Sequence, residues 1–193
     1  MTHIGNPHYP VDGNMISKIL VFSRNQFKNG IHLFNEQNIG IISIINQPKD
    51  TLQTEKFIYL NRLENVPFIS MVFSDTTLNE YNRCSDDVKK SLNLFNEVNA
   101  ITIVNFINEY KNKIDTLIIH CEAGQSRSGA VVMWANRYLH LNEKEFLKNN
   151  KKVFPNYYVY DVLCKFSAMK REHKNFWENL ERKDMKYVID NLV

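Results

Sequence analysis

The sequence predicts an α/β fold: a mainly parallel central sheet flanked by helices, with a helical C-terminal side. Three observations support this class. Short apolar, β-branched runs alternate with longer polar or amphipathic segments as far as Leu139, the pattern of parallel strands joined by crossover helices. The run from Ile39 to Ile45 is almost continuously apolar, with five isoleucines and Ser43 as its one polar residue, as in strands that are buried on both faces. Beyond Leu139 only helical signals remain.

Three strands are expected in the first part of the chain, at Ile16 to Phe22, Ile39 to Ile45 and Phe68 to Phe73. Each is rich in β-branched or aromatic side chains. The polar segment from about Arg24 to Gln37 is expected to be helical, and a turn is expected around Pro48. The polar residues from Ser74 to Thr77 end the third strand in a loop.

A long helix, or two joined helices, is expected from Ser85 onward. Ser85 is a good N-cap, and Asp86 and Asp87 suit the first turn of a helix. Apolar residues then recur every three or four positions, at Val88, Leu92, Phe95, Val98, Ile101, Val104 and Ile107. This stripe predicts the face of the helix that packs on the core.

A short strand is expected at Thr116 to Ile119. Helices are expected at Ser128 to Leu139, from Asn142, from Asn156 after the break at Pro155, and from about Asn175 to the end. Residues 1–15 form an irregular leader, and 16–193 are expected to form one domain, because 193 residues suit a single core.

Composition narrows the class of protein. The formal net charge of +3 suits anionic substrates, but its scattered lysines and arginines do not predict nucleic-acid binding. No run approaches the roughly 18 apolar residues of a membrane span, and no secretory signal is visible. We expect a soluble, intracellular, cytoplasmic protein with no membrane association.

The three cysteines are Cys84, Cys121 and Cys164. Their odd number and wide spacing predict neither a disulfide framework nor a zinc site, so we expect no metal and no cofactor. A reducing compartment fits this composition. For Cys84 and Cys164 the simplest interpretation is packing, and the alternative is that one of them traps oxidised Cys121 as a disulfide.

The segment from Ile118 to Ala130 carries the chemistry. It links a buried strand to a helix, so its backbone N–H groups and the positive end of the helix dipole converge on one spot. Gly124 lets the turn adopt a left-handed conformation. The segment therefore predicts an anion site.

Two reactive side chains bracket that site. A helix N-terminus and a nearby guanidinium favour the thiolate form of a cysteine, so Cys121 is the candidate nucleophile. Arg127 offers a planar fork that binds two phosphate oxygens at once. Metal binding by His120 and Cys121 is a weaker alternative, since no second ligand pair lies nearby.

The residues His120, Cys121, Gly124, Arg127 and Ser128 together resemble the signature of the protein tyrosine and dual-specificity phosphatase superfamily. The resemblance extends from about Ile16 to Phe166. It also includes Phe154, Pro155 and Asn156, with Leu163 seven residues further on, which are similar to the Pro-Asn segment of small dual-specificity members.

The resemblance implies a role for each matching residue. Loop residues 122–127, namely Glu122, Ala123, Gly124, Gln125, Ser126 and Arg127, bind the phosphate. Ser128 stabilises the thiolate as it leaves, and His120 orients the loop through hydrogen bonds without transferring protons. Asn156 either supports the loop or simply caps a helix.

The resemblance also implies a general acid, for which Asp75 is the first candidate. It follows an apolar strand in a polar loop, the setting in which the family places its acid. Asp86 and Asp87 lie closer to Cys121 in the sequence, but a helix's first turn favours carboxylates there for structural reasons.

The expected function is hydrolysis of phosphate monoesters through a phosphocysteine, on phosphotyrosine and also phosphoserine or phosphothreonine in proteins or peptides. The alternatives are the same chemistry on a phosphoinositide, a nucleotide or an RNA 5′ end, a non-catalytic phosphate-binding module, and a sulfur-transfer or arsenate-reducing enzyme. The loop contains no lysine, which argues against inositol lipids. Lys148, Lys151 and Lys152 form either a solvated face or a patch that concentrates anionic substrate.

Overall fold

A computed structural model describes residues 15–30, 38–46 and 65–167. Within them, four parallel strands form one sheet in the spatial order β1-β4-β2-β3. The strands are β1 (Lys18–Ser23), β2 (Ile39–Ile45), β3 (Phe68–Val72) and β4 (Thr116–Cys121). The predicted fold class is confirmed, and β2 has the bounds expected from the sequence.

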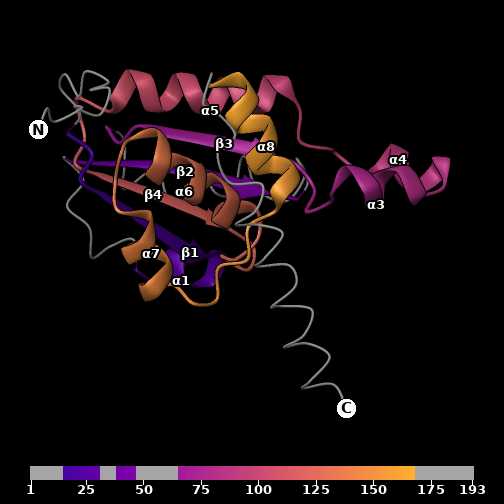
Figure 1. Cartoon of the computed structure of the whole chain (residues 1–193), viewed down its shortest axis with the longest axis horizontal. Helices are drawn as coiled ribbons and strands as arrows, with labels where there is room; N and C mark the ends of the chain where they lie inside the picture. The colour runs from indigo at the N-terminus through magenta and orange to yellow at the C-terminus, as the bar shows by residue number, and fades with distance from the viewer. Residues whose placement is uncertain (1–14, 31–37, 47–64, 168–193) are drawn as a thin grey trace, which may run out of the picture.

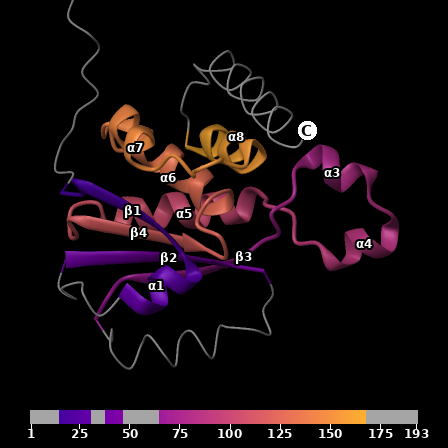
Figure 2. The same cartoon turned by 90° about the horizontal axis from the view of Figure 1, so that it is seen from below.

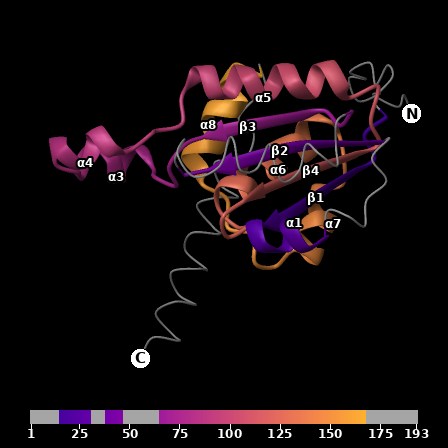
Figure 3. The same cartoon turned by 180° about the vertical axis from the view of Figure 1, so that it is seen from behind.

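Helices cover both faces of this sheet (Figures 1 and 2). One face carries α5 (Glu97–Tyr110), α6 (Arg127–Tyr138) and α8 (Tyr157–Phe166), with α7 (Glu143–Asn149) beside α6. The other face carries α1 (Arg24–Gly30), which contacts β1 and β4 and is seen beside β1 when the molecule is viewed from behind (Figure 3).

The core has two parts, one on each side of the sheet. The larger part packs Ile42 and Ile44 of β2, and Leu117 and Ile119 of β4, against the helices of the first face. The smaller part packs Ile41 and Ile118 against Phe27 of α1. Residues of β2 and β4 thus alternate between the two clusters, which explains why both strands are largely apolar.

Helices α3 (Leu78–Arg83) and α4 (Asp86–Ser91) project from the body as an arm (Figures 1–3). Neither helix has a buried residue. The base of the arm is closed by two hydrogen bonds: the Ser74 N–H donates to the Asn93 carbonyl at 2.7 Å, and the Asn93 N–H donates to Ser74 Oγ at 3.1 Å. The residues that follow β3 and precede α5 are therefore tied together.

The expected apolar stripe does not form one core face, and that prediction is wrong. The chain is extended between α4 and α5, where Asn96 starts a new helix by accepting a hydrogen bond from the Asn99 N–H. The break shifts the helical phase, so a stripe counted through it loses its register. Val88, Val98 and Ile101 are 46%, 70% and 40% exposed. The buried residues of α5 are Ala100, Ile103, Phe106 and Ile107.

Other expectations hold in part or fall outside the described residues. The helix expected from Arg24 to Gln37 is present as far as Gly30, and the helices expected from Asn142 and Asn156 begin one residue later, with those asparagines as N-caps. The turn around Pro48, the helix from Asn175 and all of the leader except Met15 lie outside the described residues. Among the described helices, none is both long and apolar enough to span a membrane.

Candidate active site

The loop that is expected to bind phosphate, residues 121–127 and hereafter the phosphate loop, joins the end of β4 to the start of α6. Its tight course depends on Gly124, which has a φ of +71°. A Cβ at this position would lie 2.4 Å from the Ser23 nitrogen at the end of β1. The loop packs so closely against β1 that no other residue type fits at position 124 without displacing this strand.

Two groups converge on the sulfur of Cys121, which is 2% exposed. The Gly124 N–H donates to Sγ at 3.3 Å, and Ser128 Oγ lies 3.1 Å from Sγ. The side chain of Ser126, the N-cap of α6, makes no capping hydrogen bond to the helix. Because Ser128 belongs to the first turn of α6, the positive end of this helix lies next to the sulfur, an arrangement that stabilises negative charge.

The side chain of Arg127, a residue that is only 4% exposed, is held at the carboxyl-terminal ends of β2 and β3. Its Nη1 donates to the side-chain oxygen of Asn46, just beyond β2, and to the Phe73 carbonyl at 3.0 Å, just beyond β3. Its Nε is buried and has no hydrogen-bond partner among the described residues. A buried unpaired donor costs about 1–3 kcal/mol, a penalty that a bound oxyanion would remove.

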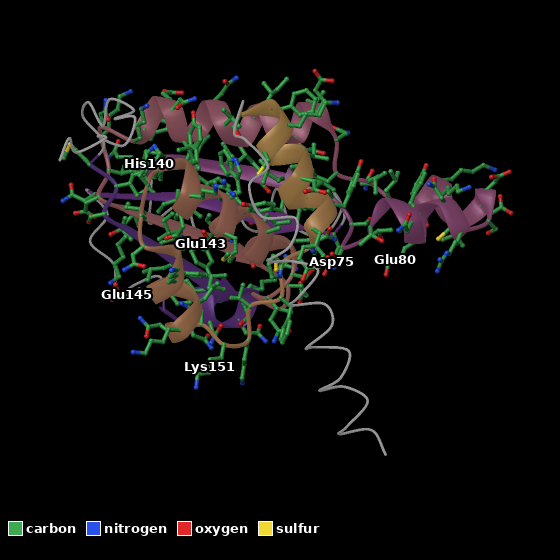
Figure 4. The ribbon with its side chains drawn as sticks, in the orientation of Figure 1. Asp75, Glu80, His140, Glu143, Glu145 and Lys151 are labelled. Atoms are coloured by element: carbon green, nitrogen blue, oxygen red, sulfur yellow. The ribbon has the colours of Figure 1, made fainter. Side chains whose placement is uncertain are left out.

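Asp75 is tied to the phosphate loop. Its Oδ1 accepts hydrogen bonds from the Ser126 hydroxyl at 2.7 Å and from Asn156 Nδ2 at 3.0 Å. Figure 4 shows Asp75 where the arm leaves the body. The structure thus brings together the candidate acid, the loop and the segment before α8.

Asn156 combines both interpretations that the sequence left open. Its Oδ1 accepts from the Val159 N–H at 3.3 Å, which caps α8, while Nδ2 donates to Asp75. Its backbone N–H also donates to the Ser126 carbonyl at 3.2 Å. One residue therefore begins a helix and links two parts of the site.

The alternative acids lie elsewhere. Asp86 and Asp87 are in the first turn of α4 on the arm, with side chains 95% and 93% exposed, and they lie near Lys89 and Lys90. No hydrogen bond joins either of them to the phosphate loop within the described residues. This is the position expected of carboxylates that stabilise the N-terminus of helix α4 through its dipole.

His120 differs from its expected arrangement. It is buried and stacks on Phe27, with ring centroids 4.1 Å apart, and neither ring nitrogen has a hydrogen-bond partner in the described part of the chain. The hydrogen bonds implied by the resemblance are therefore absent there, and packing holds the ring. Burial lowers the pKa of His120 to about 3, with smaller contributions from the positive charges of Arg24 and Lys28, so the imidazole is neutral at physiological pH.

The other loop residues face outward. Glu122, Ala123 and Gln125 are exposed, and the carboxylate of Glu122 pairs with Arg24 at 3.3 Å. Of the remaining cysteines, Cys164 is buried in α8, whereas Cys84 donates from Sγ to the Glu80 carbonyl on the arm at 3.2 Å. The described residues contain no cluster of three or more His, Cys, Asp or Glu side chains suited to a metal.

Sequence reasoning missed Asn46 and the Phe73 carbonyl as partners of Arg127. A signal for both was available, because β2, β3 and β4 are parallel and their carboxyl ends meet at one edge of the sheet. Residues that directly follow those strands are therefore neighbours of a loop that follows β4.

Two solved structures are similar to this chain in fold over most of its length. The crystal structure of PTPMT1 in complex with PI(5)P matches with a TM-score of 0.50 and 16% identity, over 80% of this chain and 93% of that chain. The crystal structure of human tyrosine phosphatase-like serine/threonine/tyrosine-interacting protein matches with a TM-score of 0.50 and 16% identity, over 78% of this chain and 91% of that chain. The chain has a dual-specificity phosphatase-like fold. No family model and no curated protein sequence matches the chain. Its similarity to known proteins therefore rests on the fold alone.

Proposed function

We propose that the chain is a cysteine-dependent phosphatase that hydrolyses phosphate monoesters through a phosphocysteine on Cys121. The convergence of the Gly124 N–H and Ser128 Oγ on the sulfur, at the N-terminus of α6, is the observation that carries the proposal. These groups favour a thiolate. The unpaired Nε of Arg127 supplies a donor for the oxyanion that the thiolate would attack.

The first chemical step breaks the bond between phosphorus and the ester oxygen. Cys121 Sγ attacks phosphorus in line, and the leaving alkoxide or phenoxide takes a proton from Asp75. Arg127 and the loop amides bind the equatorial oxygens, whose negative charge is spread in the transition state. The product alcohol or phenol departs and leaves phosphate on sulfur.

The second step hydrolyses the phosphocysteine. Asp75, now a carboxylate, takes a proton from water as that water attacks phosphorus, and the bond between phosphorus and sulfur breaks. Ser128 Oγ, 3.1 Å from Sγ, donates to the thiolate that leaves. Inorganic phosphate is released, and the thiolate is ready for another cycle.

The proposed substrate is phosphotyrosine in proteins or peptides, with phosphoserine and phosphothreonine as further substrates. The loop residues that would contact phosphate include no lysine, which disfavours the highly charged inositol lipids. The three free cysteines also support work in a reducing, intracellular compartment. The cysteine chemistry proposed here needs no metal.

Cys121→Ser tests the proposal directly. The variant should lose turnover of p-nitrophenyl phosphate but still bind vanadate, because the loop amides and Arg127 remain. Asn136→Ser, a buried polar change in α6 away from the loop, controls for general destabilisation and should retain turnover. Turnover by Cys121→Ser, or inhibition of the wild type by chelators, would overturn the mechanism.

A further inference from the structure

The arm exposes apolar side chains that the body of the molecule does not cover. Leu78 on α3 and Val88 on α4 are both exposed, and neither helix has a buried residue. Each helix has six residues, whereas an isolated helix shorter than roughly 12–15 residues is only marginally stable in water. Short helices gain most of their stability by packing on another surface, so the arm presents a face that a partner can cover.

Helix α4 is accessible to such a partner. In Figures 1, 2 and 3 the arm stands clear of the sheet and of the helices that cover it. The side-chain hydrogen bonds and ion pairs that α4 makes with other described residues stay within the helix: Lys90 with Asp87, Lys89 with Asp86, and Ser91 Oγ to the Val88 carbonyl. A partner can therefore bind α4 without breaking a side-chain contact to the body.

The charges of α4 are arranged in two opposite halves. Asp86 and Asp87 precede Val88, and Lys89 and Lys90 follow it. The ion pairs within the helix, at 3.9 Å and 3.0 Å, leave both carboxylates exposed and able to accept further hydrogen bonds. A partner of one charge sign, such as a nucleic acid, would be attracted by one half of the helix and repelled by the other.

A second copy of the chain matches this pattern. If two α4 helices lie antiparallel about a two-fold axis near Val88, the acidic half of each helix lies beside the basic half of the other. The positive end of each helix dipole then also lies beside the negative end of the other, which is favourable. The two Val88 side chains meet at the centre and cover each other. One surface thus supplies its own complement.

We infer that α4 is a self-association surface, through which two copies of this chain form a symmetric dimer. The contact joins two helices of six residues, which is less surface than a stable interface buries, so we expect a weak dimer with a dissociation constant of roughly 10 to 100 μM. The inference concerns assembly. Its test measures no turnover, so its failure is distinct from failure of the proposed function.

Sedimentation velocity of the full chain from roughly 5 to 500 μM tests the inference. The wild type should shift from monomer toward dimer as its concentration rises, and added salt should weaken the dimer. Asp86→Lys/Asp87→Lys makes every charge of α4 positive, and Lys89→Asp/Lys90→Asp makes every charge negative. Each variant alone should raise the dissociation constant about tenfold or more, because attraction across the interface becomes repulsion.

Mixing the two variants is the decisive measurement. An equimolar mixture should associate again, because a positive α4 then meets a negative one, and mixing would not repair an arm that had merely unfolded. The matched control, Lys113→Asp/Lys144→Asp, reverses two exposed lysines outside the arm and should keep the dissociation constant of the wild type. Cys121→Ser should also sediment like the wild type, since the phosphate loop is not part of the contact.

Three results would overturn the inference. A wild type that stays monomeric at every concentration would show that the arm does not join two copies. A dimer that persists unchanged in both charge variants would place the interface on another surface. Loss of the dimer in both variants, with no association in their mixture, would show that these charges stabilise the arm and do not act across an interface.

Discussion

His120→Phe is expected to remove most of the sensitivity to acid that this residue gives the folded chain. Burial lowers the pKa of His120 from 6.5 to about 3, helped by the charges of Arg24 and Lys28. Phenylalanine preserves a ring stacked on Phe27, and no hydrogen bond is lost within the described residues, because neither ring nitrogen makes one there. The substitution therefore removes the titration while keeping the packing.

The magnitude follows from the two pKa values. Above pH 6.5 the imidazole is neutral in both states, so His120 makes stability independent of pH. As the pH falls below 6.5, the unfolded chain binds a proton that the folded chain does not bind, and the free energy of unfolding decreases. The loss is complete only below the folded pKa of about 3. Between pH 7 and pH 5 it amounts to about 2 kcal/mol.

The assay is urea unfolding at pH 7, 6 and 5, followed by the fluorescence of the buried Trp134. Overpacking by the larger ring would shift stability equally at every pH, so the slope with pH is the readout. His140→Gln, at an exposed position, controls for loss of a histidine and should keep the wild-type slope. If His120→Phe loses as much stability between pH 7 and pH 5 as the wild type, the account of His120 as a neutral packing residue is refuted.

Three further substitutions test the site. Asp75→Asn should lower kcat roughly 10²- to 10⁴-fold for phenyl phosphate but much less for substrates with good leaving groups. The kcat values of wild type and variant are compared over a series of leaving groups. If the loss of kcat is the same for every leaving group, Asp75 is not the acid. Ser128→Ala removes the hydroxyl 3.1 Å from the sulfur and should slow the second step by roughly ten- to a hundredfold. Stopped-flow should then show a burst of p-nitrophenol, and its absence with an unchanged steady rate would contradict the role of Ser128. Gly124→Ala places a Cβ 2.4 Å from the Ser23 nitrogen at a φ of +71° and should cost about 1–3 kcal/mol in thermal unfolding; an unchanged Tm would argue against this loop geometry.

The strands and the phosphate loop could be predicted from the sequence because their signals are local. In β2, seven consecutive buried residues leave little choice of bounds. The loop combines a strand end, a glycine at positive φ and a helix start within a few residues. Each of these features is imposed by neighbours in the chain, so the spacing of Cys121 and Arg127 was informative by itself.

The helix stripe was misjudged because periodicity says nothing about a break in phase. Asn96 and Asn99 form a reciprocal cap that starts α5 anew, and a polar pair of this kind was a visible start signal. Counting the apolar residues from Asn96 alone would have placed Ile103 and Ile107 inside. It would also have left Val88 outside the apolar face of α5, in agreement with its exposed position on the arm.

The expected parallel sheet indicated that the residues after β2, β3 and β4 lie at one edge, but local patterns did not predict which of them bond to one another. The bond from Ser126 to Asp75 spans 51 residues, and the bond from Arg127 to Asn46 spans 81. Both depend on the spatial order β1-β4-β2-β3, in which β2 lies between β4 and β3. Alternation of strands and helices predicts a parallel sheet, but it does not fix which strands are adjacent.

Trapping the phosphoenzyme tests the central claim most directly. Wild-type protein and Ser128→Ala would be mixed with p-nitrophenyl phosphate, quenched in acid within milliseconds and digested for mass spectrometry. The account predicts phosphate on the peptide that contains Cys121, with more of it in Ser128→Ala than in the wild type and none in Cys121→Ser. Steady turnover with no phosphate on Cys121 in either protein, or with phosphate on a different residue, would contradict the account.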